Sequence, residues 1–231
     1  MHRQRRNSPQ SDALLRVWRK LPIAAACLVW VSAFGSGQTV VDQIITLVNN
    51  AMITRSDLLW SIALDPEAPS PEGGVSNDLL RQKLDIMIDQ RLIAQEASRL
   101  PAAQITADEI NKAKAALIAK FHSEADFRKR VQAVGLGQSK IDELIRERVT
   151  INKFIDFRFR SFVFVSDQDI KKYYDERLVP EIRKQGQVPP PIETLHDKIQ
   201  DVLKQESVNE GIDKFLKEAR QQANIVQLVE L

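Results

Sequence analysis

The stretch that most constrains the fold of this chain covers residues 78–100. It contains neither glycine nor proline and consists mainly of good helix formers, so one long helix is predicted. Its apolar residues form two stripes, which is wider than the single core-facing stripe of a surface helix. The stripes are Leu80, Leu84, Met87 and the Arg91 stem, and Leu79, Ile86, Ile93, Ala97 and Leu100. This helix must therefore be covered on two sides, by its own chain or by a partner.

The charge of the chain is unevenly distributed. Residues 1–37 hold six of the 33 basic residues but only one of the 31 acidic residues. The remaining 194 residues are therefore mildly acidic, with a formal charge of −3. A body of mixed charge gives no electrostatic reason to expect nucleic acid as a partner.

Residues 1–37 have the pattern of a signal peptide. A basic start precedes a 14-residue apolar run at 21–34, and three small residues follow it at 35–37. Fourteen residues are too few to cross about 30 Å of hydrocarbon comfortably. We therefore predict export with cleavage after Gly35 or Gly37, leaving no integral membrane span. An uncleaved signal anchor is the alternative.

Cys27 is the only cysteine, and it lies inside the apolar run. Residues 24–27 weakly match a lipoprotein cleavage box, but the apolar run continues beyond Cys27, so lipidation is the less favoured interpretation. The chain after the signal would contain no disulfide and no thiolate, which is compatible with an oxidising compartment.

Beyond the signal, the sequence predicts a mainly α fold with a small sheet. Residues 40–48 and 51–53 are expected to be strands joined at Asn49–Asn50, and 65–74 a flexible loop. Helix caps are predicted at Thr54, Asn77, Thr106, Ser123, Ser139 and Ser166, with the long helix stopped by Pro101 and a short strand at 162–165. A helix from Ile192 to about Ala223 and a strand at 225–229 follow. This last strand needs a partner, and the first strand is the best candidate.

The sequence shows no catalytic or metal-binding pattern. His122 and His196 lack a second histidine or cysteine at metal-ligand spacing, and no phosphate loop, GxSxG or HExxH motif is present. Asp85, Asp89 and Glu96 recur along one predicted helix. Ion pairs with nearby arginines on the helix surface are a sufficient explanation for these carboxylates. We therefore expect a protein that is not an enzyme and has no cofactor.

Two features could instead serve recognition. Phe154, Phe157, Phe159, Phe162 and Phe164 alternate with Arg158 and Arg160. Such a mixture can bind single-stranded nucleic acid, but packing in a core is the favoured interpretation. Flexible apolar side chains near the long helix could contact a peptide, with ordinary packing as the alternative. The candidate peptide-binding residues are Met52, Trp60, Leu80, Leu84 and Met87.

The order of these parts resembles SurA-type periplasmic chaperones. Residues 41–50 and 53–58 are similar to the opening of that family, and 84–97 to its central helix. Residues 165–174 are similar to the segment that leads into a parvulin prolyl-isomerase domain. The helix from Ile192 and the strand at 225–229 resemble the family's returning C-terminal segment.

The resemblance has one large departure. Only about fifteen residues, 175–189, separate the Tyr173–Tyr174 helix from the proline-rich stretch, too few for a parvulin domain of roughly ninety. The resemblance therefore implies the chaperone module alone. Its parts would be a helical body at 38–185, a connector at 186–191 and a completing helix and strand at 192–231.

The resemblance also implies a function. Such a module holds unfolded envelope or outer-membrane proteins in an apolar crevice without ATP. The alternatives are a non-catalytic periplasmic adaptor or scaffold that binds one folded partner, and a residual prolyl isomerase. An incomplete sheet or an exchanged C-terminal helix would also allow a homodimer.

Overall fold

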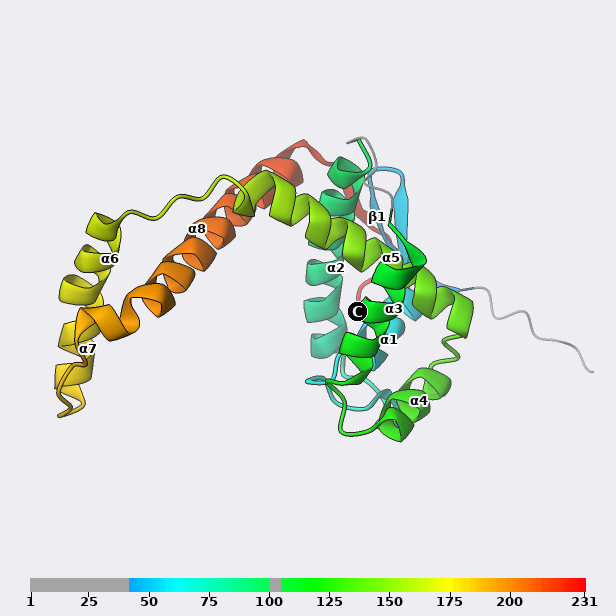
Figure 1. Cartoon of the computed structure of the whole chain (residues 1–231). Helices are drawn as coiled ribbons and strands as arrows, with labels where there is room; N and C mark the ends of the chain where they lie inside the picture. The colour runs from blue at the N-terminus through cyan, green and yellow to red at the C-terminus, as the bar shows by residue number, and fades with distance from the viewer. Residues whose placement is uncertain (1–41, 100–104) are drawn as a thin grey trace, which may run out of the picture. The chain divides into compact units, whose positions relative to one another are not determined.

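The computed structural model describes residues 42–99 and 105–231, the unit drawn in colour in Figure 1. The predicted signal peptide, the residues at 38–41 and the stop at Pro101 lie outside the described residues. Within that unit the fold is mainly α with one small sheet, as the sequence predicts.

The sheet joins the two ends of the described chain. Strands β1 (Ile44–Val48), β2 (Ala51–Thr54) and β3 (Ile225–Gln227) are antiparallel in the order β2-β1-β3, so the last strand pairs with the first as predicted. Asn49 makes the hairpin turn with a φ of 54°. The register shifts between Ile44 and Thr46, and both Ile45 and Thr46 are buried. The irregularity therefore gives β1 an additional inward side chain.

Eight α-helices hold most of the residues that the structure describes. They are α1 (Arg55–Ala63), α2 (Asn77–Ala97), α3 (Ala107–Ile118), α4 (Glu124–Ala133), α5 (Gln138–Ile155), α6 (Asp167–Tyr173), α7 (Val179–Lys184) and α8 (Ile192–Gln222). A 3₁₀ turn, η2 (Pro71–Gly73), precedes α2, and π-helical turns η3 (Asp156–Arg160) and η4 (Tyr174–Leu178) extend α5 and α6. Residues 175–189 thus form η4, α7 and the start of an extended connector.

Most of the predicted caps are confirmed. Thr54, Thr106 and Ser166 each form a complete capping box, and the Ser123 side chain accepts from the Asp126 amide. Two predictions are wrong by one or two residues. Ser76 rather than Asn77 caps α2, and α5 begins after Gly137, which places Ser139 inside the helix. The predicted strand at 162–165 is also wrong, because Phe162 lies in a turn and residues 163–165 pair with no described strand.

Helix α2 is covered by its own chain. Leu80, Leu84, Met87, Ile88 and Leu92 are buried with residues of β1, β2 and α1 in the main core, while Ile93 and Ala97 pack against Phe154 of α5. Helix α8 contacts α2 as well. The prediction of covering on two sides is confirmed. Ile86, however, is 43% exposed, so the second apolar stripe is only partly buried.

The first part of the loop between α1 and α2, up to Pro69, is anchored, which corrects the prediction of a flexible loop for that part of 65–74. Arg130 of α4 is only 5% exposed and donates to the backbone carbonyls of Ile62, Ala63, Asp65, Ala68 and Pro69 at 2.7–3.4 Å. Lys83 of α2 also pairs with the Asp65 carboxylate. One buried guanidinium therefore provides hydrogen-bond donors for the free backbone carbonyls at the end of α1 and in the turn that follows.

Helix α8 has two different sets of neighbours. Its first part packs against α6 and the segment before it, and its later part packs against η3 and α2 (Figure 1). The helix stays continuous through Gly211, which the sequence marks as its weakest position. A Cβ built there would lie 3.0 Å from the Phe159 ring. Gly211 thus lets η3 approach α8 closely.

Candidate functional site

Three of the five candidate peptide-binding residues are buried. Leu80, Leu84 and Met87 are 0%, 6% and 7% exposed and belong to the main core. These three side chains therefore offer no surface to a partner. The apolar stripe in the sequence correctly predicted that these residues are buried. It did not show that other elements of the same chain bury them.

The other two candidates lie on different surfaces. Met52 is 54% exposed and stands opposite Leu47, which also faces Val226, so three apolar side chains cross the outer face of the sheet. Trp60 is half-buried against a second apolar cluster, which is formed by helices α3, α4 and α5. Its indole N–H donates to the Val134 carbonyl at 3.2 Å. The structure therefore does not bring the five predicted residues together.

An exposed aromatic surface is found instead at the end of α5. Phe157, Phe162 and Phe164 are 59%, 76% and 86% exposed, and the rings of Phe157 and Phe162 lie 6.5 Å apart. Core packing was the favoured interpretation for all five phenylalanines. It holds for buried Phe154 and half-buried Phe159, and it is wrong for these three.

Backbone geometry explains this exposure. Successive side chains of an extended segment point to opposite sides. Val163 and Val165 pack with Ile170 and Ile199 between α6 and α8. Phe164, between the two valines, consequently lies on the opposite, solvent-facing side, and Phe162 is exposed in the turn that precedes them. Packed and exposed side chains do alternate over 162–165, as the predicted strand implied. The two valines, however, pack against helices α6 and α8.

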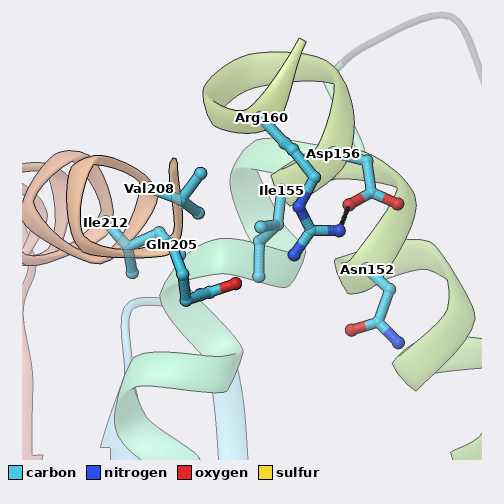
Figure 2. A pocket seen from close by; sticks show the side chains of 7 residues that line it. All are labelled: Asn152, Ile155, Asp156, Arg160, Gln205, Val208 and Ile212. Atoms are coloured by element: carbon cyan, nitrogen blue, oxygen red, sulfur yellow. Dashed lines mark hydrogen bonds and ion pairs between the residues drawn. The ribbon is translucent and has the colours of Figure 1, made fainter. Parts of the chain in front are cut away.

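A half-open cavity of about 350 Å³ lies beside this aromatic surface, between α5 with η3 and the middle of α8 (Figure 2). Ile155, Val208 and Ile212 form its apolar part, and Val208 is 1% exposed. The polar lining residues are Asn152, Asp156, Arg160 and Gln205. We call this cavity with its seven lining residues the α5–α8 cleft. Its residues come from segments about fifty positions apart, and no local motif predicts them.

The charged groups of the cleft are paired. Arg160 bonds to the Asp156 carboxylate one helical turn earlier, as Figure 2 shows. The Asp156 carbonyl accepts from the Ser161 amide at 2.9 Å, which is the i to i+5 bond of a π-turn. The π-turn lets the chain leave α5 at the mouth of the cleft. The cleft thus combines an apolar lining, neutral amides and one compensated ion pair.

Neither a metal centre nor a membrane-spanning helix is found where the structure is described. Across residues 42–99 and 105–231, no three histidine, cysteine, aspartate or glutamate side chains gather closely enough to hold a metal ion. In the same ranges, no helix has both the length and the apolar character that crossing a membrane requires.

The described residues thus define a helical domain with a small closing sheet and an amide-lined cleft. No family model matches the sequence. The chain is, however, 29% identical over 154 residues to the Chaperone SurA of Cupriavidus pinatubonensis, a match that covers 63% of this chain and 30% of that protein. The Chaperone SurA of Cupriavidus metallidurans is 28% identical over 141 residues, which cover 59% of this chain and 28% of that protein.

These similarities confirm the resemblance to SurA-type chaperones. The matched region spans less than a third of the length of the curated relatives.

Proposed function

We propose that this protein is an ATP-independent periplasmic chaperone that holds unfolded envelope or outer-membrane polypeptides and has no isomerase activity. The observation that carries the proposal is the exposed aromatic surface of Phe157, Phe162 and Phe164 beside the α5–α8 cleft. The similarity to two proteins named Chaperone SurA supports it. The basic and apolar start of the sequence supports export.

The physical character of this surface suits weak and broad binding. Burial of apolar surface contributes about 25 cal/mol per Å², so covering three phenylalanines on a few hundred Å² would contribute several kcal/mol. Association and ordering of a flexible chain cost a similar amount. The balance favours binding that is reversible without nucleotide. Among the earlier candidates, the buried Leu80, Leu84 and Met87 would act by supporting the fold, and the exposed Met52 lies on strand β2, outside the aromatic surface.

The proposal is tested by aggregation of an unfolded outer-membrane β-barrel diluted from urea without nucleotide. We expect several-fold excess of this protein to suppress light scattering. The double variant Phe162→Ser and Phe164→Ser should lose most of that effect and keep its stability, because both rings are solvent-exposed. Val188→Ser is the matched control, because Val188 is 90% exposed in the connector, outside the cleft. No suppression by the unaltered protein would contradict the proposal.

The absence of isomerase activity is tested separately. Cis–trans exchange of a short proline peptide should stay at the uncatalysed rate in the presence of the protein. Measurable catalysis would contradict this part of the proposal.

A second candidate function is an adaptor for one folded partner. It is favoured by the apolar row of Leu47, Met52 and Val226 on the outer face of the sheet. Substitution Met52→Ser distinguishes the two functions. It should weaken capture of a single folded partner if the adaptor function holds, and leave aggregation suppression nearly unchanged if the chaperone function holds.

A further inference from the structure

We propose that the α5–α8 cleft binds the main chain of an extended polypeptide through the side-chain amides of Asn152 and Gln205. The inference deepens the proposed chaperone function and rests on it. It identifies which part of a client polypeptide the cleft recognises, namely the peptide groups rather than particular side chains.

The first step concerns the chemistry of the two amides. A carboxamide carries a carbonyl acceptor and an N–H donor, the same pair that a peptide group offers. A polypeptide that moves from water into a cleft must find partners for its N–H and C=O groups. Amide side chains meet that need for a client of any sequence.

The second step concerns their placement. Asn152 belongs to α5 and Gln205 to α8, so the two amides stand on opposite walls of the cleft (Figure 2). Both side chains are exposed, and among the described residues the Asn152 amide has no protein hydrogen-bond partner, so a bound chain would replace water there. The Gln205 Nε2 donates to Asn209 Oδ1 at 2.8 Å, which leaves its Oε1 as an acceptor. Together the walls offer two acceptors and the Asn152 donor to a chain lying between them.

The third step excludes a charged ligand. Arg160 is the only cation among the lining residues, and it already bonds to the Asp156 carboxylate. The Asp156 carboxylate compensates the charge of that guanidinium, so the cleft offers neither an anion nor a cation an unpaired charge. A neutral peptide group needs no such charge.

The fourth step concerns the apolar part of the cleft. Ile155, Val208 and Ile212 line it, and exposed Phe157 follows Asp156 directly in η3. These side chains exclude water from around a bound segment, and hydrogen bonds strengthen where water is excluded. A polypeptide could therefore bond to the amides while its side chains contact the neighbouring phenylalanines.

The inference is tested by fluorescence anisotropy with a labelled, unstructured peptide of mixed sequence and a copy of it that is N-methylated at alternate backbone nitrogens. Methylation removes N–H donors and keeps the side chains. We expect the unaltered protein to bind the plain peptide roughly tenfold more tightly than the methylated one, the effect of two hydrogen bonds. The variant Asn152→Leu with Gln205→Leu should bind both peptides equally weakly.

A matched variant and a fold measurement control this experiment. Gln221→Leu with Gln222→Leu removes two exposed amides from the same helix α8, outside the cleft, and should preserve the tenfold preference. Circular dichroism should show unchanged helix content in both double variants.

The outcomes separate this inference from the proposed function. If the Asn152 and Gln205 variant keeps the preference for the plain peptide, main-chain recognition by these amides is wrong while the chaperone function stands. If the unaltered protein binds neither peptide and suppresses no aggregation, the proposed function itself fails.

Discussion

Two regions of the molecule bury their helices in different ways. The region around α2 and the sheet has twelve buried side chains in one cluster, six of them with no exposed surface. The region where α6 packs on the start of α8 has three, Val165, Ile170 and Ile199, surrounded by half-buried residues. Since stability follows buried apolar area, the first region should carry the global fold and the second should open locally at lower cost.

Polar contacts follow the same division. In the first region Arg130 is buried and bonds to five carbonyl groups. In the second, the exposed Arg177 reaches Glu206, and the partly exposed His196 lies between two exposed aspartates. Exposed pairs contribute little to stability because water screens them. The α5–α8 cleft lies where these two sets of α8 neighbours meet.

The largest effect is expected from Arg130→Met. The substitution keeps an apolar stem but leaves the carbonyls of the 62–69 turn without their donor in a buried place. We expect the free energy of unfolding to fall by about 3–5 kcal/mol, measured by urea unfolding. Arg128→Met is the control, since Arg128 is exposed and paired only with Glu124, and it should cost less than about 0.5 kcal/mol. Equal effects of the two variants would show that the buried carbonyl contacts contribute nothing.

A smaller effect separates the two regions directly. Leu80→Ala removes a fully buried side chain from the main core and should reduce global stability by about 3 kcal/mol. Ile170→Ala removes a side chain that is 1% exposed in the smaller cluster. We expect it to speed amide hydrogen exchange in residues 167–184 while global urea unfolding changes by less than about 1 kcal/mol. Faster exchange throughout the chain in Ile170→Ala would mean that the two regions unfold together.

Local structure could be predicted from the sequence where local chemistry decides it. The capping boxes at Thr54, Thr106 and Ser166 need only residues three positions apart, and all three were predicted. The pairing of β3 with β1 was predicted because an apolar terminal strand needs a partner. Cap positions at Ser76 and Gly137 were missed because neighbouring residues offer almost equivalent caps.

The site could not be predicted in the same way, because it depends on tertiary packing. The two-stripe pattern of α2 identifies buried residues but not the elements that cover them. The alternation at 162–165 indicates two opposite sides, and only the position of α8 decides that the phenylalanines face solvent. Nothing near Asn152 in the sequence points to Gln205. Arg130 was likewise missed, since a buried arginine without a carboxylate has no local pattern.

The smallest predicted effect concerns pH and the second region. Hydrogen bonds from His196 to Asp197 of α8, at 3.1 Å, and to Asp167 of α6, at 3.3 Å, raise the pKa of His196 above its ordinary value of 6.5. A raised folded-state pKa stabilises the fold fully below pH 6.5, and this contribution is lost as pH rises through the folded-state value.

The amides of α6 should therefore exchange faster, beyond the intrinsic pH effect, when the pH is raised from about 5 to about 9. His196→Gln should lose this pH dependence, because glutamine does not titrate in this range. Global unfolding should change little, since His196 is partly exposed and belongs to the weaker region. If the pH dependence persists in His196→Gln, the effect comes from other titratable groups. His196 would then contribute nothing to the packing of α6 on α8, which would depend on apolar contacts alone.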